Sequence, residues 1–177
     1  MHESVMAWGN EMLTEGLIRG ADVLDVGSYD VNGSWRGLAM RYSPASYVGV
    51  DFRMGPGVDR VANAEELPAL FPDGFDVVFS TEVLEHAERW REALTGMWSV
   101  VRPRGVLMVT CRGPGFAKHD FPHDYWRFTP ELLKRCFPAE AAASVRADPQ
   151  VPGVFLWARK PARGGLLTFM DEPVRVY

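Results

Sequence analysis

The sequence predicts an α/β protein in which helices cover both faces of a mostly parallel sheet. Short apolar segments alternate along the chain with segments whose apolar residues recur every three to four positions. Strands that alternate with helices form a parallel sheet between two helical layers. The 177 residues are enough for one domain with a substantial core, and no repeat or linker interrupts them.

Composition favours a globular protein and gives no sign of a nucleic-acid or membrane ligand. The hydrophobic fraction is 47%, and the net charge of −4 provides no basic footprint. No apolar run approaches membrane-spanning length, and the first residues lack the pattern of a signal peptide. Cys111 and Cys136 match no metal or redox spacing, so we expect reduced thiols in a soluble, cytoplasmic protein without a membrane partner.

The first third of the chain is expected to contain two helices and three strands. Residues 3–19 carry an apolar face and are followed by a glycine, which predicts a helix that covers the sheet. Short apolar runs predict strands at 22–26 and 47–51, with a helix at 34–42 between them. A short strand at 58–61 would follow through a loop, because the intervening FRMGPG is too broken for a crossover helix.

The middle of the chain continues the alternation. NAEELP at 63–68 predicts a short helix, and a Pro-Asp-Gly turn leads into a strand at 75–79. An apolar stripe with helical period predicts a helix through 90–101, which Arg-Pro-Arg-Gly should end. An apolar strand at 106–111 is expected to follow.

The last third should add one helix and two strands. Thr129 is a suitable N-cap and Pro130 a suitable first helical residue, which predicts a helix start. Two further strands are expected, one around Val145 and one at 154–158, joined by a proline-rich turn. The whole chain, residues 1–177, is therefore interpreted as a single domain, with 1–20 as an N-terminal helical segment.

The strand at 22–26 leads into a pattern that suits a nucleotide pocket. Gly27 follows Asp25 after one residue and allows a ligand to approach the backbone closely. The second and third glycines of a dinucleotide-binding loop are absent at their required spacing. An acid before the glycine could instead receive a cationic amino group, as an amino-acid-bearing nucleoside would offer. An ordinary tight turn after a buried strand remains the alternative.

A second acid stands in a corresponding position. Asp51 ends the strand at 47–51, about 25 residues after the glycine loop, where an acid can bind ribose hydroxyls. An acid that merely starts a turn would look the same. Combined with Asp25 and Gly27 at this spacing, Asp51 favours the ribose interpretation.

Five segments, in order between about Val23 and Phe137, resemble the motifs of class I S-adenosylmethionine-dependent methyltransferases. They are VLDVGS, YVGVD, NAEELP, FDVVFSTEVLEH and VVRPRGVLMVT. The resemblance implies a Rossmann-like three-layer sandwich whose sheet has seven strands, or six, mostly parallel with an antiparallel C-terminal strand. It also implies a methyltransferase enzyme with S-adenosyl-L-methionine as the cofactor.

The same resemblance implies the cofactor site. It implies that Asp25 and Gly27 hold the methionine end, Asp51 the ribose hydroxyls, and Asn63 with Ala64 the adenine. Backbone near Thr81 and Glu82 would line the methyl channel. Ser28 and Phe52 complete the implied cofactor site. Two features depart from the family pattern. The loop lacks the usual repeated glycines, and Asn63 replaces the more usual Asp, although an amide can also meet the adenine edge.

The methyl acceptor is expected at residues 112–128, a substrate loop rich in histidine, acid and aromatic residues. His119 or His123 in this loop, or His86 before it, could be the general base for a hydroxyl, an effect of roughly 10²–10⁴-fold. The same residues could instead tie down a long loop. We expect a small-molecule acceptor that offers a hydroxyl (less favoured, an amine), such as a sugar or a natural-product intermediate.

The spacing of Glu82, Glu85 and His86 raises a metal alternative. ExxEH at a helix start would place the three on one face, and it resembles the metal-binding motif of small-RNA 3′-terminal and ubiquinone-pathway O-methyltransferases. His119 or His123 could add a ligand. The same letters occur at a plain helix start in metal-free members, so no metal site is assigned.

Two other function classes stay open. A metal-assisted RNA 2′-O-methyltransferase is disfavoured by the acidic balance, so a nucleic-acid partner is not expected. A non-catalytic nucleoside-binding partner subunit would keep the pocket without turnover. A homodimer that completes the site is also considered, because the chain has little room for a separate substrate domain.

Overall fold

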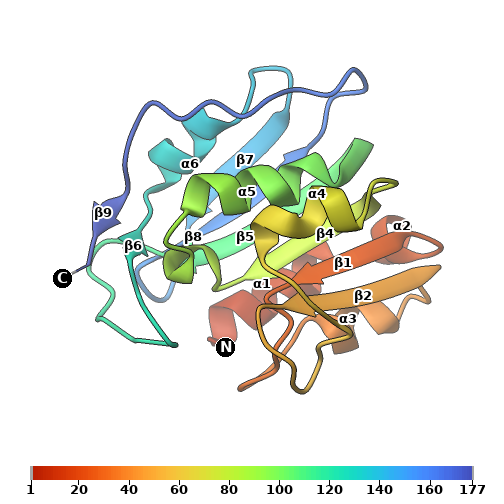
Figure 1. Ribbon diagram of the computed structural model, residues 1–177, viewed down its shortest axis with the longest axis horizontal. Helices are drawn as coiled ribbons and strands as arrows, with labels where there is room; N and C mark the ends of the chain where they lie inside the picture. The colour runs from red at the N-terminus through yellow and green to blue at the C-terminus, as the bar shows by residue number, and fades with distance from the viewer. Residues whose placement is uncertain (1, 177) are drawn as a thin grey trace.

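The computed structural model describes residues 2–176 and contains a seven-stranded sheet with helices on both faces (Figure 1). The strand order is β3-β2-β1-β4-β5-β8-β7, and β8 runs antiparallel to both of its neighbours. The remaining pairs are parallel. The predicted α/β sandwich with seven strands and an antiparallel C-terminal strand is confirmed.

The strands of the sheet are β1 (Asp22–Val26), β2 (Ser46–Asp51), β3 (Arg60–Val61), β4 (Phe75–Thr81), β5 (Val101–Arg112), β7 (Ala142–Ala147) and β8 (Gly153–Arg159). A separate antiparallel pair, which the sequence did not predict, consists of β6 (Trp126–Arg127) and β9 (Val174–Arg175). The helices are α1 (Glu3–Met12), α2 (Glu15–Ile18), α3 (Arg36–Met40), α4 (Leu67–Leu70), α5 (Trp90–Ser99) and α6 (Pro130–Cys136). Two 3₁₀ turns are η1 (Ala64–Glu66) and η2 (Leu84–His86).

Side chains of the central strands alternate between two apolar cores, as the two-residue period of a strand requires. Val23, Phe79 and Met108 pack on one side with α1, α2 and α3, and their cluster includes the stacked rings of Trp8 and Phe155. The other side packs against α4, α5 and α6 and contains alternate residues of the same strands. Both faces of the sheet are therefore covered, which explains the continuous apolar runs in the sequence.

Several element bounds differ from the predicted ones. The helix expected at 3–19 is interrupted, because α1 ends at Met12 and α2 starts only at Glu15. The helix expected at 34–42 is limited to 36–40, and the strand expected at 58–61 retains only its last two residues. Helix α6 begins as predicted, with the Thr129 hydroxyl accepting a hydrogen bond from the Leu132 amide at 3.2 Å.

Helix α5 ends at Ser99, and the Arg-Pro-Arg-Gly segment at 102–105 that was expected to end it is an irregularity inside β5. Val101 pairs with Phe75 and Val106 with Val77, so four residues of β5 face one residue of β4. Arg104 within this bulge has a φ of 68°. The Arg-Pro-Arg-Gly segment thus marks a real break in regular structure, but β5 pairs with β4 both before and after it.

Two further expectations concern the thiols and membrane crossing. Cys111 and Cys136 are both free and buried, as expected for reduced thiols. Among the described residues, no helix has the length and apolar character needed to cross a membrane.

Candidate functional site

The carboxyl ends of the parallel strands β1 and β4 lie side by side at the point where the order of the strands in the sheet reverses. From β1 the sheet continues to β2 on one side, and from β4 it continues to β5 on the other. Ligands of open α/β sheets bind in the crevice outside such a switch point. Of the residues predicted for cofactor binding, those that follow β1, β2 and β4 meet at this edge.

Gly27 permits the loops after β1 and β4 to touch. Its φ is +82°, a conformation that favours glycine, and its amide donates to the Val50 carbonyl at 2.8 Å. A Cβ at this position would lie 2.0 Å from Cγ2 of Val83 in the loop after β4. The group that lies close to the Gly27 backbone in the structure is the Val83 side chain, and the predicted close approach of a ligand stays a prediction.

Asp25 is turned toward β2 rather than open to solvent. It is 3% exposed, and its Oδ2 accepts a hydrogen bond from the Tyr47 hydroxyl at 2.7 Å. Burial raises the pKa of Asp25 to about 7, against the opposing hydrogen bond from Tyr47. A cation nearby would favour the ionised form of this carboxyl. Whether it meets the methionine end of the cofactor stays a prediction.

Asp51 closes the end of β2 and connects two loops. Its Oδ2 accepts from the Tyr29 amide at 3.3 Å, and its Oδ1 accepts from the Arg53 amide at 3.2 Å. Burial raises the pKa of this carboxyl. Next to it, Phe52 is 48% exposed and can offer its ring to a ligand. The buried Ser28 hydroxyl has no hydrogen-bond partner within the described chain.

The predicted adenine segment lies against α5. The Asn63 side-chain amide donates to Glu66 Oε2 at 3.0 Å, and the Asn63 backbone amide donates to the same oxygen at 2.7 Å. A Cβ on Gly96 would lie 2.0 Å from the Ala64 carbonyl oxygen, so a glycine in α5 allows η1 to pack this closely. Asn63 is exposed, and part of its amide is already used within the protein.

Glu82 does not join the other two residues of the ExxEH motif in a cluster. It has a φ of +58°, its Oε1 accepts from the Thr110 hydroxyl at 2.7 Å, and it forms an ion pair with Arg112. Arg112 is 2% exposed, and burial lowers its pKa to about 10. The expectation that Glu82, Glu85 and His86 share one face of a helix start is wrong, because η2 includes only residues 84–86.

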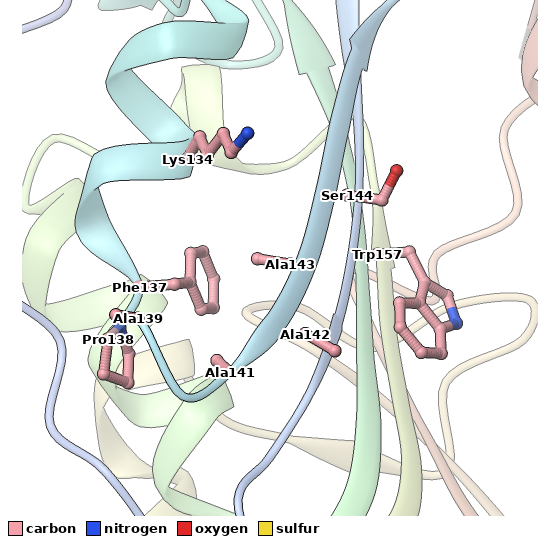
Figure 2. A pocket seen from close by; sticks show the side chains of 9 residues that line it. All are labelled: Lys134, Phe137, Pro138, Ala139, Ala141, Ala142, Ala143, Ser144 and Trp157. Atoms are coloured by element: carbon pink, nitrogen blue, oxygen red, sulfur yellow. The ribbon is translucent and has the colours of Figure 1, made fainter.

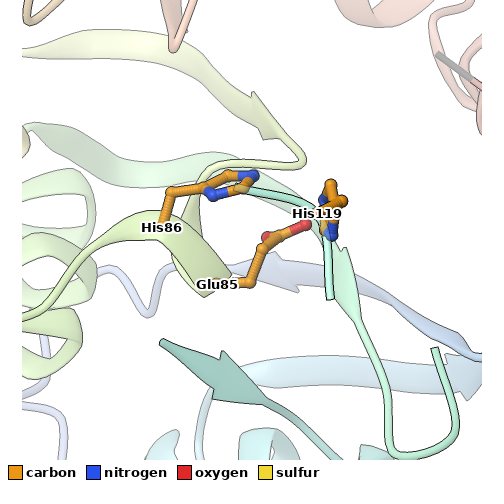
Figure 3. Close-up of side chains that lie close together, drawn as sticks. All are labelled: Glu85, His86 and His119. Carbon is orange, nitrogen blue, oxygen red and sulfur yellow. The ribbon is translucent and has the colours of Figure 1, made fainter. Parts of the chain in front are cut away.

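Glu85 and His86 meet His119 instead, and we call these three residues the Glu85 cluster. One ligand atom from each lies within 4.8 Å of the others (Figure 3). Glu85 and His86 come from η2, and His119 comes from the substrate loop. The ring centroids of His86 and His119 are 4.9 Å apart. The fold thus brings together two of the three histidines proposed as catalytic.

Both imidazoles of the cluster are oriented through Nδ1. The Nδ1 of His86 lies 2.5 Å from the His123 carbonyl oxygen, which can only accept, so Nδ1 carries the proton. The Nδ1 of His119 is 3.0 Å from Asp124 Oδ2, a contact with the distance but not the angle of a hydrogen bond. Each ring therefore retains Nε2 for another ligand. The His123 ring itself lies beside Tyr125, at 5.7 Å between centroids.

Glu85 is the most unusual group of the site. It is completely buried, and neither carboxyl oxygen has a hydrogen-bond partner among the described residues. Burial raises its pKa to about 8. Its backbone carbonyl accepts from the Tyr125 amide at 2.8 Å, which joins η2 to the substrate loop.

Part of the charged run in the substrate loop has a structural role. Arg127 is 3% exposed and donates to both oxygens of Asp124, at 2.5 and 2.6 Å. It also donates to the carbonyls of Phe116 and Ala117. Burial opposes ionisation of Asp124, but the hydrogen bonds from Arg127 lower its pKa overall. Sequence reasoning did not single out Arg127 as the residue that holds the loop; its spacing of three from an acid was the available signal.

One cavity lies elsewhere. It has a volume of about 470 Å³ and lies between α6 and the edge strand β7 (Figure 2). Ala142, which lines it, pairs with Arg159, whereas the carboxyl end of β5 pairs with Gly153 at the other end of β8. This cavity is therefore at the opposite end of the sheet from the Glu85 cluster.

Comparison with known proteins gives a family and a fold. Residues 24–109 match the family model of the methyltransferase domain. No curated protein matches the sequence significantly. A chain of an S-adenosylmethionine-dependent methyltransferase from Archaeoglobus fulgidus is 16% identical, with a TM-score of 0.67, over 89% of this chain and 94% of that chain.

Two further structures are similar in fold. The 1,6-didemethyltoxoflavin-N1-methyltransferase of Burkholderia thailandensis, solved with 1,6-didemethyltoxoflavin and S-adenosylhomocysteine, is 20% identical, with a TM-score of 0.62 over 90% of this chain and 79% of that chain. A chain from a Haloferax volcanii complex that contains a methyltransferase activator is 14% identical, with a TM-score of 0.65 over 90% of both chains. The match of residues 24–109 to the methyltransferase-domain model, together with this fold, shows that the chain is similar to class I S-adenosylmethionine-dependent methyltransferases.

Proposed function

We propose that this methyltransferase transfers the methyl group of S-adenosylmethionine to a hydroxyl of a small molecule, such as a sugar or a natural-product intermediate. The observation that supports this acceptor is the Glu85 cluster, which places two imidazoles next to the loop that faces Gly27. The acceptor oxygen would form a bond to the methyl carbon as the carbon–sulfur bond breaks. The products would be a methyl ether, S-adenosylhomocysteine and a proton.

The cofactor would lie across the carboxyl ends of β1, β2 and β4. In this proposal Asp51 binds the ribose hydroxyls, and Asp25, Gly27 and Ser28 surround the methionine end. Phe52, Asn63 and Ala64 would contact the adenine, and backbone near Thr81 and Glu82 would line the path of the methyl group. The positions of Asp51 at a strand end and of Gly27 at the switch point support this arrangement.

The histidines favour a hydroxyl over an amine. An alcohol must lose its proton to become a good nucleophile, whereas a neutral amine attacks with its lone pair before any proton leaves. A general base next to the acceptor therefore contributes most to O-methylation, roughly 10²–10⁴-fold. His119 is the better placed candidate because Asp124 contacts its Nδ1, and His86 is the second. His123 remains a weaker candidate, since only its carbonyl reaches the cluster.

A small-molecule acceptor fits the charge of the chain better than RNA does. The net charge is −4, and the similar Burkholderia structure holds a small molecule together with the cofactor product. We also propose a cytoplasmic location, consistent with two free cysteines, and a single functional domain whose residues 112–128 face the acceptor. A second copy could complete the acceptor side.

Calorimetry and an acceptor screen test this function. S-adenosylmethionine and S-adenosylhomocysteine should each bind once per chain. A panel of matched alcohols and amines, read out as S-adenosylhomocysteine formed, should show turnover of alcohols. Cofactor binding without turnover of any acceptor would favour a non-catalytic partner subunit, and salt-sensitive RNA binding would favour the RNA-directed alternative.

Single substitutions of the histidines assign their roles. His119→Ala should lower kcat by about 10²-fold or more while cofactor affinity is retained, because the base acts only on the acceptor. His123→Ala is the matched control, with a change of no more than a few-fold. If amines are turned over faster than alcohols, or if no histidine substitution lowers kcat more than a few-fold, the hydroxyl assignment is wrong.

A further inference from the structure

We propose that Glu85, His86 and His119 bind a divalent transition-metal ion, which would hold the oxygen of the methyl acceptor. The role of the acceptor rests on the proposed function, but binding of the ion does not. The proposal starts from Glu85, whose two carboxyl oxygens are buried without a hydrogen-bond partner in the described chain. Buried carboxyl groups are normally paired or coordinate a metal.

The nearby cations of the protein are already engaged with other acids. Arg112 pairs with Glu82, and Arg127 donates to both oxygens of Asp124. Neither arginine side chain donates a hydrogen bond to the Glu85 carboxyl group among the contacts of the described residues. Glu85 is therefore left without a side-chain cation as partner, and it lies beside the imidazoles of His86 and His119.

The positions of the three donors fit one ion after a contraction of the cluster. They lie within 4.8 Å of one another. Bonds of about 2.0–2.2 Å to a shared ion in tetrahedral geometry place the donors about 3.4 Å apart. The donors therefore need to approach one another by at most about 1.4 Å, and His119 is in an irregular loop that can supply this movement.

The surroundings of the two histidines are those expected for metal ligands. Histidines that bind a metal through one nitrogen typically donate the other N–H to a carboxylate or a carbonyl, which fixes the ring. The Nδ1 of His86 lies against the His123 carbonyl, and the Nδ1 of His119 lies against Asp124. The Nε2 atoms are thereby left for the ion. While the ion is bound the imidazoles act as ligands, and the base role proposed above applies to the metal-free protein.

The donor types select the class of metal. Two imidazole nitrogens and one carboxylate suit Mn²⁺, Fe²⁺, Co²⁺ or Zn²⁺, whereas Mg²⁺ prefers oxygen ligands. Glu82 does not complete the set, because it is bound to Thr110 and Arg112. Three protein ligands leave positions for water or substrate, as in catalytic rather than structural sites.

The chemical consequence concerns the proton of the acceptor. A hydroxyl bound to a divalent ion loses its proton at lower pH than it does in water. That proton would pass to solvent, and the oxygen would form its new bond to the methyl carbon as the carbon–sulfur bond breaks. The ion is neither oxidised nor reduced.

Metal titration of the full chain tests the proposal directly. After treatment with a chelator, the protein should bind one Mn²⁺ or Co²⁺ per chain by calorimetry and more tightly than Mg²⁺. Glu85→Gln and His119→Ala should each weaken this binding at least about tenfold, and Asp120→Asn, an exposed acid on the same loop, should not. Binding of S-adenosylmethionine by each variant serves as the check that it is folded.

The outcomes separate this proposal from the proposed function. Failure of Mn²⁺, Co²⁺ and Zn²⁺ to bind at a 1:1 ratio, or equal binding by His119→Ala, would overturn the metal site. Methylation of an alcohol by metal-free protein would then still support the proposed function. Conversely, 1:1 metal binding that depends on His119, without turnover of any alcohol, would support the metal site and count against the proposed function.

Discussion

Replacement of Asp25 by Asn should make the protein more stable at alkaline pH than the parent. The Asp25 carboxyl is 3% exposed, and burial raises its pKa from 3.8 to about 7. Asn is nearly isosteric and can still accept the hydrogen bond that the Tyr47 hydroxyl donates at 2.7 Å. The substitution thus removes the ionisation while it keeps the contact.

The direction of this pH effect on stability follows from proton binding to Asp25 in the folded and unfolded states. Between pH 3.8 and about 7 the unfolded chain loses this proton first, so the parent loses stability as the pH rises. The rise from 3.8 to about 7 sets an upper limit of about 4 kcal/mol on the loss. Asp25→Asn should therefore match the parent near pH 4 and exceed it increasingly up to about pH 8, by no more than this amount.

Urea unfolding at a series of pH values measures the difference. Asp22→Asn in the same strand is the control, because the hydrogen bonds from Ser46 and Arg102 lower the pKa of Asp22. That variant should be less stable than the parent at neutral pH, and the difference should shrink in acid. Equal pH dependence of Asp25→Asn and the parent would refute the inference that the Asp25 carboxyl is ionised with difficulty.

Two further substitutions test the loops around the site. Gly27→Ala should weaken binding of S-adenosylmethionine and destabilise the fold by about 1–3 kcal/mol, because the φ of Gly27 is +82° and a Cβ would meet Val83. Calorimetry measures the affinity, and thermal unfolding measures the stability. Unchanged affinity would argue against a cofactor site at the switch point. Arg127→Met should cost about 3–5 kcal/mol in urea unfolding, because the buried Asp124 carboxylate loses its arginine partner. A loss below 1 kcal/mol would show that the pair does not hold the substrate loop.

The central sheet could be predicted because its signals are local. Strand β1 has the predicted bounds, and Asp51 ends β2 as expected, since short apolar runs between turn residues leave few alternatives. The bulge at 102–105 could not be predicted, because a turn signal does not say whether the chain afterwards returns to the same neighbour.

The acceptor side was predicted only in part, because it depends on contacts between distant segments. The sequence placed Glu82 with Glu85 and His86, but a buried arginine from β5 holds Glu82 in another direction. His119 reaches the cluster through an irregular loop that Arg127 fixes, and no periodicity predicts such a path. The residue types of the site were therefore recognised, with His119 or His123 as a possible partner of Glu85 and His86, while the choice of His119 and the exclusion of Glu82 required the structure.

The affinity of S-adenosylmethionine for the parent and for Asp51→Ala tests the cofactor assignment most directly. By calorimetry the parent should bind one cofactor per chain. The alanine variant should bind at least about tenfold more weakly, since a hydrogen bond to a charged group contributes about 1.5–3 kcal/mol. Equal affinity of the two proteins, or no binding by the parent, would contradict the assignment of the β2 acid to the ribose.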